Sequence, residues 1–366
     1  MKILIVGAGP AGLACAEQIL VQSDADVTVV DKKQKVGENP RCAGGISLWM
    51  AEKVGLQIPS QCVVANIRRV RMYAPNGDYW ELKGEKDYGH VIDRQLFEQS
   101  MAERVELLGG KIQLGHMVSE NDLCFWFSNY DVIVGADGYP SVVSAWAGVP
   151  QVEPYDVHHC FQKEILWDEF PSDTIELYFG KVAPKGYLWL FSAGNGRVRA
   201  GLGTPLSEKA DLNELLDGFL QRQTDHYQEV NKVAKLIPTA HPRDTNTFLR
   251  GRALLVGDAG LFCDPATGGG IVQGIASGKA AGLALAEGVS KNYDQHINWL
   301  RKQNRTRYRL KQILYTFTDD DLNELIQILK GFKPKTMSVG KELRRAAIHL
   351  VMRKPKLLRK FLKVLS

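Results

Sequence analysis

The residues best suited to chemistry in this 366-residue chain begin with a glycine-rich loop close to its start. Gly7, Gly9, Ala11 and Gly12 follow an apolar run, and Asp31 comes after the next apolar run. In a strand-loop-helix setting, the first glycine permits a tight turn, the second lets backbone N–H groups approach a pyrophosphate, and the third permits close helix packing. The loop therefore predicts dinucleotide binding, with Asp31 accepting hydrogen bonds from the adenosine ribose.

A second glycine-rich segment lies far along the chain, at residues 255–271, LVGDAGLFCDPATGGGI. After a short apolar run, Asp258 can present a carboxylate to ribityl hydroxyls. Gly268, Gly269 and Gly270 then open a helix whose N-terminal dipole, with the N–H groups of Gly270 and Ile271, would stabilise negative charge on a reduced flavin ring. The two segments together indicate one long cofactor, FAD, held at both ends.

Two further patterns support this arrangement. The run DVIVGADG at 131–138 is an apolar strand that turns at Asp137, where the chain would pass beneath the cofactor; a simple strand and turn is the alternative interpretation. Glycines also recur every fourth residue in the helix that this second glycine-rich segment opens, which lowers helix propensity by about 1 kcal/mol for each glycine relative to alanine and therefore predicts very close packing. They are Gly270, Gly274, Gly278 and Gly282.

The elements that must position these residues can be read from periodicity. Residues 2–6 and 25–30 are expected strands joined by a helix over 11–22, which makes a βαβ unit. A helix is expected over 94–108, begun by Asp93 and ended by Gly109-Gly110. Strand patterns dominate residues 157–204 and predict a second, mostly antiparallel sheet.

The fold class expected is α/β, with a Rossmann-like FAD-binding domain interleaved with a mostly antiparallel substrate domain, followed by C-terminal helices. The boundaries expected for these three parts are as follows. The FAD-binding domain comprises 1–60, 89–156 and 245–290, the substrate-binding domain 61–88 and 157–244, and the helical region 291–366.

Composition limits the function classes. Six cysteines without a C-x-x-C pair favour reduced thiols in a cytoplasm, and the eight histidines show no metal-ligand spacing, so no metal is expected. No signal peptide or membrane-spanning run is expected. The net charge of +5 is a property of the tail, where residues 341–366 carry nine Lys or Arg against Glu342 alone.

Within that tail, residues 357–365, LLRKFLKVL, place apolar and basic side chains on opposite helical faces. This pattern is typical of a helix resting on an anionic membrane surface, and a helix docked on its own domain is the alternative. Nucleic acid is not expected as a partner, because the basic region lacks interleaved aromatics. The expected location is cytoplasmic, with peripheral attachment to a membrane.

Four motifs add a family resemblance: NPRCAGGIS (39–47), VIDRQLFE (91–98), YFGKVAPKGYLWLF (178–191) and GDAGLFCDPATGGGI (257–271). Together they are similar to the geranylgeranyl reductase family, whose members reduce isolated double bonds of polyprenyl chains. That family belongs to the para-hydroxybenzoate hydroxylase superfamily of FAD enzymes, which the glycine loop at 7–12, the run at 131–138 and the segment at 255–271 resemble in this order. The resemblance covers residues 1 to about 290.

The resemblance implies a set of FAD contacts. Val118 is included by its position on an expected strand more than by a motif. The chain departs from the family at Gly260-Leu261, where Ala-Gly is common, and at Ser144, where an arginine is usual. The implied contacts are Ala11, Gly12, Asp31, Cys42, Ala43, Gly45, Arg94, Val118, Asp258, Gly270 and Ile271.

The reaction implied is saturation of an isolated C=C bond by a flavin hydride and a proton, with cationic character stabilised by the aromatic faces of Tyr187 and Trp189. The alternative is that these aromatics merely face a core. Cys42 is expected beside the flavin, in contact with it or with substrate, or else as a small buried residue.

The partners implied are a prenyl lipid, quinone, pigment or diphosphate as substrate, and a membrane surface met by the basic C-terminal helices. Because no second dinucleotide loop is visible, electrons are expected from transiently bound NAD(P)H or from a ferredoxin-like carrier protein. Two alternatives stay open: an FAD-dependent aromatic monooxygenase, and a non-enzymatic flavin redox sensor.

Overall fold

The computed structural model describes residues 1–224, 226–241, 247–249, 253–288, 292–331, 345, 348–349 and 351–353. The chain forms two compact units, each assembled from three separate stretches, and this confirms the interleaved α/β architecture. Unit 1 is Met1–Pro40, Arg94–Val157 and Leu236–Tyr308, and unit 2 is Arg41–Asp93, His158–Lys235 and Arg309–Ser366.

Unit 1 contains a six-stranded sheet in the order β15-β16-β9-β1-β2-β8. The pairs of β1, β2, β8, β9 and β16 are parallel, and only the edge strand β15 runs antiparallel to its neighbour. The strands are β1 (Lys2–Val6), β2 (Asp26–Val30), β8 (Lys111–Gln113), β9 (Val132–Gly135), β15 (Thr247–Leu249) and β16 (Ala253–Leu255).

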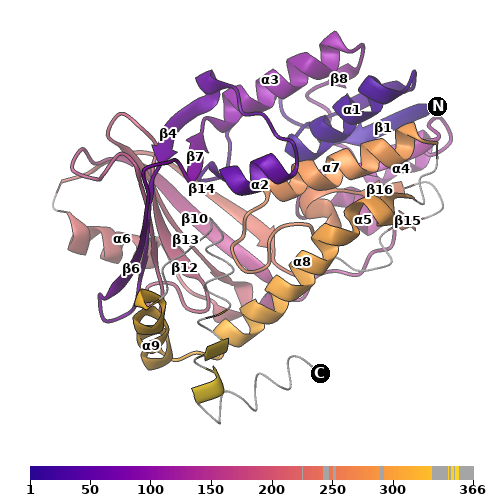
Figure 1. The fold of residues 1–366 in the computed structure, drawn as a ribbon. Coiled ribbons are helices and arrows are strands. Elements are labelled where there is room, and N and C mark those ends of the chain that lie inside the picture. Colours follow the sequence, from indigo (N-terminus) through magenta and orange to yellow (C-terminus); the bar gives the residue numbers. More distant parts are fainter. Residues whose placement is uncertain are drawn as a thin grey trace. The chain divides into compact units, whose positions relative to one another are not determined.

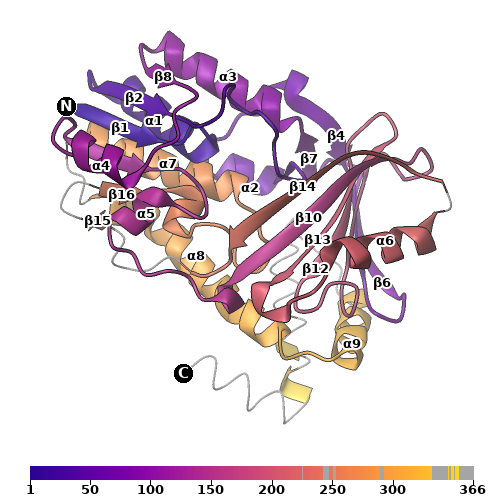
Figure 2. The ribbon, with the colours of Figure 1, turned by 180° about the vertical axis from the view of Figure 1, so that it is seen from behind.

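Helices cover both faces of this sheet, as the nearly continuous apolar strands require. Alternate strand residues such as Leu4 and Ile133 pack with Leu123 of α4 and Trp146 of α5. Figures 1 and 2 show α1, α3 and α7 on the other face. The helices are α1 (Pro10–Gln22), α3 (Arg94–Leu107), α4 (Glu120–Trp126), α5 (Val142–Trp146) and α7 (Ile271–Ala286), with short 3-10 turns η2 (Pro154–Asp156) and η4 (Gly257–Gly260).

Unit 2 contains a seven-stranded sheet in the order β14-β10-β13-β12-β11-β5-β6 and a three-stranded sheet in the order β3-β7-β4. β11 and β5 pair parallel, and the pairs β10–β13, β13–β12, β12–β11, β5–β6, β3–β7 and β7–β4 are antiparallel. The strands are β3 (Gly45–Ser47), β4 (Val63–Ile67), β5 (Arg69–Tyr73), β6 (Tyr79–Lys83), β7 (Gly89–Ile92), β10 (Val157–Leu166), β11 (Thr174–Tyr178), β12 (Tyr187–Ser192), β13 (Arg197–Pro205) and β14 (Gln228–Pro238).

One face of the larger sheet is closed by a helix that packs on alternate residues of the strands. Leu188 and Leu190 of β12 are fully buried there with Leu216 and Leu220 of α6. The helix α9 packs in the same way against β5 and β6. The helices and 3-10 turns of unit 2 are α2 (Leu48–Lys53), η1 (Ser60–Cys62), η3 (Leu206–Glu208), α6 (Leu212–Gln223) and α9 (Asp319–Lys330).

The C-terminal part begins with the long helix α8 (Tyr293–Leu314), which contributes residues to both units. The expected helical region 291–366 is therefore divided between the units, and residues 41–60, expected with the FAD domain, group with unit 2. The amphipathic segment 357–365 lies outside the described residues. None of the described helices combines the length and hydrophobicity that crossing a membrane requires.

Candidate functional site

The glycine loop between β1 and α1 has the geometry that its sequence predicts. Gly7 has φ +114°, and a Cβ at this position would lie 2.3 Å from the Ala136 carbonyl oxygen. At Gly12 a Cβ would lie 2.0 Å from the Gly7 carbonyl oxygen, so both positions need glycine. A Cβ at Gly9, in contrast, would meet no atom of the described residues within 4 Å. The backbone at Gly9 is thus open for a ligand to approach.

The N-terminal and C-terminal glycine segments meet in space. A Cβ at Gly257 would lie 2.9 Å from the Ala11 Cβ, and one at Gly274 would lie 3.5 Å from the same atom. Because Gly7 also borders Ala136 at the end of β9, three distant segments converge at the carboxyl ends of β1, β9 and β16. This edge of an open parallel sheet is where α/β folds bind ligands.

The glycine stripe on α7 brings α7 and α1 unusually close. Cβ atoms at Gly278 and Gly282 would lie 2.1 Å from the Ala11 carbonyl oxygen and 2.7 Å from the Cys15 carbonyl oxygen, both on α1. The predicted close packing is therefore confirmed at these two positions. At Gly274 the contact is an ordinary one, so only part of the stripe is required by space.

Two helix ends at this site are suited to binding an anionic group. Gly9 precedes α1 and Gly270 precedes α7, and neither helix has a side-chain cap at its N-terminus. The first N–H groups of a helix have no partner inside the helix, and its dipole favours negative charge at this end. The Asp258 carboxylate lies next to Gly270, 3.2 Å from where a Cβ would stand. These features fit a cofactor with a pyrophosphate and an electron-accepting ring.

The Asp31 carboxylate accepts hydrogen bonds from two backbone N–H groups, one of them in the glycine loop. Its Oδ2 accepts the Ala8 N–H at 2.7 Å, and its Oδ1 accepts the Lys33 N–H at 2.9 Å. A carboxylate has about four acceptor positions, so two such bonds leave capacity for ribose hydroxyls. Asp31 therefore fits both the expected ribose contact and a role in holding the loop.

Two residues of α8 hold the second glycine segment in place, and the sequence did not reveal them. The fully buried Asn304 donates its amide N–H groups to the carbonyl oxygens of Phe262 and Cys263, at 3.0 and 3.2 Å. Arg307 pairs with the buried Asp264 carboxylate. The Asp264 N–H in turn donates to the Gly269 carbonyl oxygen at 2.9 Å. The only sign of this role in the sequence was that Asn304 and Arg307 are polar residues three positions apart on one helix.

Three expected cofactor residues have structural neighbours of their own. The Asp137 carboxylate accepts the Ser141 hydroxyl at 2.7 Å and the Val142 N–H at 2.7 Å, so it holds the start of α5, and burial raises its pKa. Arg94 pairs with the buried Glu98 one turn along α3. Val118 lies in the loop before α4 and not on a strand, because β8 ends at Gln113. Contact of these residues with FAD stays a prediction.

In unit 2, the aromatic side chains of β12 lie on the face opposite α6. Leu188 and Leu190 fill the core beneath that helix, so alternation places Tyr187 and Trp189 on the other face. Their rings are 5.8 Å apart. A Cβ at Gly201 on β13 would lie 2.5 Å from the Trp189 indole, so the missing side chain makes room for that ring. The aromatics therefore do not belong to the α6 core.

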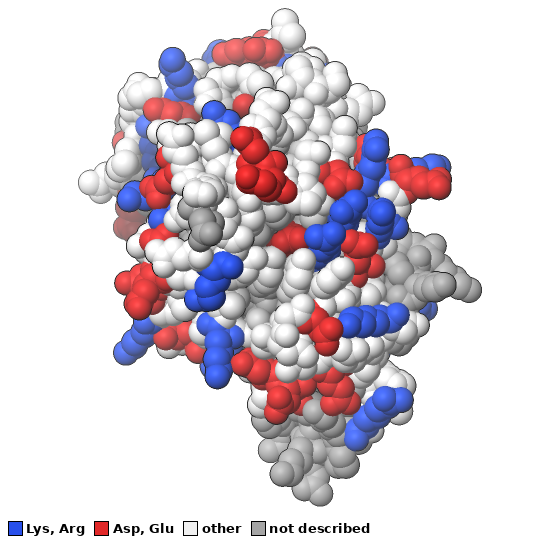
Figure 3. All heavy atoms as spheres, turned by 90° about the vertical axis from the view of Figure 1, so that its left-hand side faces the viewer, with Lys and Arg blue, Asp and Glu red and all other residues white. Residues whose placement is uncertain are grey.

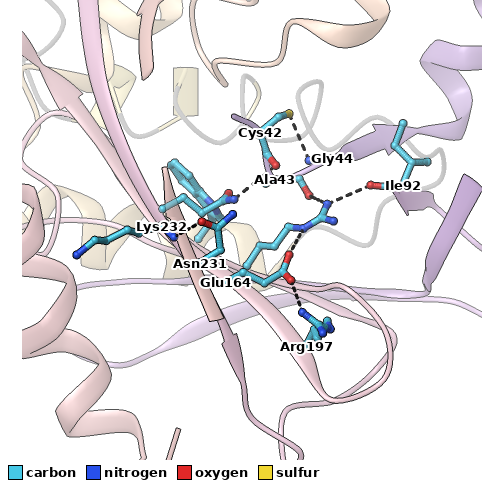
Figure 4. Close-up of polar contacts among 11 residues, drawn as sticks. Cys42, Ala43, Gly44, Ile92, Glu164, Arg197, Asn231 and Lys232 are labelled. Atoms are coloured by element: carbon cyan, nitrogen blue, oxygen red, sulfur yellow. Dashed lines mark hydrogen bonds and ion pairs between the residues drawn. The ribbon is translucent and has the colours of Figure 1, made fainter. Parts of the chain in front are cut away.

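The Cys42 loop also belongs to unit 2 and is tied to the same sheet (Figure 4). Gln162 of β10 accepts the Trp189 indole N–H at 3.2 Å and donates to the Cys42 carbonyl oxygen at 3.5 Å. The Cys42 sulfur accepts the Gly44 N–H at 3.3 Å. Gly45 leaves room for Phe191, whose ring would lie 2.5 Å from a Cβ there. Two expected catalytic residues, Cys42 and Trp189, are thus joined through one glutamine.

Among the described residues, no group of three or more His, Cys, Asp or Glu side chains is placed to hold a metal ion. Figure 3 shows Lys and Arg side chains interspersed with Asp and Glu on the face it draws. Cys160, on the same strand as Gln162, is a thiol whose pKa burial raises to about 12.

Family models match two segments of the chain. Residues 156–237 match the geranylgeranyl reductase catalytic domain, and residues 5–43 match an NAD(P)-binding Rossmann-like domain. The first segment contains β10 to β13 and most of β14, and so includes Tyr187 and Trp189. The second contains the glycine loop and Asp31.

Curated relatives align over nearly the whole chain. The digeranylgeranylglycerophospholipid reductase of Methanosarcina acetivorans is 28% identical over 370 residues, which cover 92% of this chain and 90% of that protein. Digeranylgeranylglycerophospholipid reductase 2 of Methanopyrus kandleri is 28% identical over 398 residues, which cover 98% of this chain and 97% of that protein.

Solved structures share the fold. A geranylgeranyl bacteriochlorophyll reductase-like protein from Thermoplasma acidophilum has a TM-score of 0.86 at 20% identity, covering 99% of this chain and 98% of that chain. The flavin-dependent brominase Bmp2 has a TM-score of 0.67 at 16% identity, covering 97% and 100%. The resemblance to the geranylgeranyl reductases and the expected fold class are confirmed.

Proposed function

We propose that this chain, whose substrate sheet matches the geranylgeranyl reductases, is an FAD-dependent reductase that saturates isolated C=C bonds of prenyl chains. The match of residues 156–237 to the reductase catalytic domain carries this proposal. The nucleotide-binding part alone would not distinguish a prenyl reductase from a halogenase, because flavin-dependent halogenases share the fold. The segment that distinguishes these classes is the sheet bearing Tyr187 and Trp189.

FAD fits unit 1 in several respects. The open backbone at Gly9 and the N-terminus of α1 suit the pyrophosphate, Asp31 the ribose, and Asp258 with the N-terminus of α7 the ribityl chain and flavin ring. When bound, the cofactor supplies a hydride equivalent for the alkene. The protein contributes binding, orientation and a fixed electrostatic environment.

The substrate that we propose is a geranylgeranyl chain carried on a glycerophospholipid, because the curated relatives are named for such a lipid. An isolated alkene lacks a carbonyl that could accept electron density, so protonation must accompany hydride transfer. The electron-rich faces of Tyr187 and Trp189 are suited to stabilising cationic character on the alkene carbons. NAD(P)H or a ferredoxin-like protein would supply the electrons, and the basic tail would meet the anionic membrane that holds the lipid.

An anaerobic assay tests the proposed reaction. The purified flavoprotein is reduced with dithionite and mixed with digeranylgeranylglycerophospholipid, and both flavin reoxidation and product mass are followed. We expect reoxidation with a gain of two hydrogen atoms for each double bond reduced. The fully saturated lipid is the control and should leave the flavin reduced.

Other results of this assay would point elsewhere. Flavin that is reoxidised only when oxygen and an aromatic compound enter would indicate a monooxygenase. Flavin that no prenyl or aromatic compound reoxidises would indicate a redox sensor. Either result would overturn the reductase assignment.

The aromatic pair gives a separate prediction. A variant with Tyr187→Leu and Trp189→Leu should lose about 100-fold or more in turnover per bound flavin, because each electrostatic contact at a developing charge contributes roughly tenfold or more. Single-turnover reoxidation of the reduced flavin measures this directly. Tyr79→Leu, which removes an exposed aromatic from β6 of the same sheet, is the control. Unchanged turnover in the double variant would rule out the role.

A further inference from the structure

The Cys42 loop is held against the sheet of unit 2 by one arginine. Arg199 of β13 donates from Nη1 to the Ala43 carbonyl oxygen at 2.9 Å and to the Ile92 carbonyl oxygen at 3.0 Å. Both accepting residues are labelled in Figure 4. The Ile92 N–H donates to the Gly44 carbonyl oxygen at 3.0 Å. One guanidinium group therefore joins the loop, the end of β7 and the sheet.

The position of Arg199 is itself fixed. Its Nε donates to Glu164 Oε2 at 3.2 Å, and the other oxygen of Glu164 accepts Arg197 Nη1 at 2.7 Å. The side chain of Arg199 is only 14% exposed, whereas that of Arg197 is 42% exposed. A planar guanidinium held at one edge by a carboxylate presents its remaining donors in a defined direction.

The loop is shaped to receive this guanidinium. Gly44 has φ +79°, and a Cβ there would lie 2.5 Å from Arg199 Nη1 and 2.6 Å from the Ile92 carbonyl oxygen. The Gly44 N–H also donates to the Cys42 sulfur. The contact that fixes Gly44 and Ala43 thus fixes the thiol two residues before.

We propose that Arg199 is a positioning residue that sets the place of the Cys42 thiol relative to the face bearing Tyr187 and Trp189. The contact with Gln162 ties the Cys42 carbonyl to Trp189, and Arg199 ties the next carbonyl along the loop. Both tethers start from neighbouring strands of one sheet, so the loop moves with the sheet. The catalytic consequence rests on the proposed reductase function, whereas the tether itself does not.

The test compares Arg199→Met with Arg197→Met in the FAD-bound protein. Arg197 is the matched control, because it lies on the same strand and binds the same Glu164 but is more exposed. The first readout is the rate at which iodoacetamide alkylates Cys42, assigned by peptide mass. The exposed Cys124 provides an internal reference for the reagent. The second is kcat and KM for the prenyl lipid.

Arg199→Met should raise the ratio of Cys42 to Cys124 alkylation about tenfold, since loss of charge-assisted hydrogen bonds loosens the loop. It should lower kcat by about 100-fold with little change in KM, because misplacement of a reacting group affects the chemical step. Arg197→Met should match the wild type in both readouts. Arg199→Lys should fall between them, since an ammonium lacks the planar fork.

Two outcomes would overturn the proposal. One is an alkylation ratio in Arg199→Met equal to that of wild type, and the other is an equal rise in Arg197→Met. If Arg199→Met does not fold, Arg199→Lys decides, and wild-type alkylation in a folded Arg199→Lys protein counts against the tether. Alkylation requires no turnover, so failure of the reductase assay would leave this test intact.

Discussion

A Gly278→Ala variant is expected to lose about 3 kcal/mol of folding free energy, at the upper end of the usual cost of overpacking. A Cβ at this position would lie 2.1 Å from the Ala11 carbonyl oxygen and 3.0 Å from the Ala11 carbonyl carbon. Both atoms belong to the backbone of α1, so relief requires α1 and α7 to separate. That movement would displace Ala11 and Gly12, which also line the expected pyrophosphate site.

Gly274→Ala is the matched control, one turn earlier on the same helix. Its Cβ would meet the Ala11 Cβ at 3.5 Å, an ordinary contact, and alanine raises helix propensity by up to about 1 kcal/mol. We expect this variant to be as stable as the wild type or slightly more stable. Urea denaturation at equal FAD concentration measures both variants. If the two variants had equal free energies of unfolding, the close approach of α1 and α7 would not be the reason that glycine is needed at position 278.

The sequence predicted the glycine loop of the site best, because the conformation of that loop depends on residues next to one another in the chain. A glycine turn after a buried strand and before a helix constrains its own backbone, so Gly7, Gly12 and the start of α1 lie where expected. The convergence with Gly257 could be predicted as well, because the carboxyl ends of parallel strands share one edge of the sheet. Local pattern and global fold agree at these positions.

Other features depend on strand register, which the sequence does not reveal. Arg199 meets the Cys42 loop only because β13 pairs with β10 so that Arg199 stands opposite Glu164. A shift of one residue would turn Arg199 toward the α6 core. Gln162 likewise reaches Trp189 across β13, through the glycine at position 201. No spacing along the chain relates these residues.

The alternation on β12 illustrates a related limit. Tyr187, Trp189 and Phe191 alternate with Leu188 and Leu190, and both sets are apolar enough for a core. The sequence therefore indicated two faces without showing which one α6 would cover. The local partners of Asp137 could not be read from its motif either: its carboxylate holds the start of α5, and its expected contact with the cofactor stays a prediction. A short polar residue at a turn often has such a local partner.

Asp31→Ala is expected to weaken FAD binding about 100-fold, because hydrogen bonds to a charged group contribute about 1.5 to 3 kcal/mol and the carboxylate serves several at once. Its loss removes the acceptors of the Ala8 and Lys33 N–H groups as well as the expected ribose contact. The loop would then no longer be held in the form that receives a pyrophosphate. Titration of the apoprotein with FAD, followed by quenching of flavin fluorescence, measures the dissociation constant.

Asp26→Ala controls for the loss of a negative charge at the other end of β2. The Asp26 carboxylate pairs with Lys111 at 2.9 Å, and both side chains are well exposed, so this pair contributes little. FAD affinity should stay within about twofold of the wild type in this variant. If Asp31→Ala behaved like Asp26→Ala, the ribose assignment would be wrong. The α1 N-terminus and the second glycine segment would then have to account for FAD affinity without a carboxylate at the end of β2.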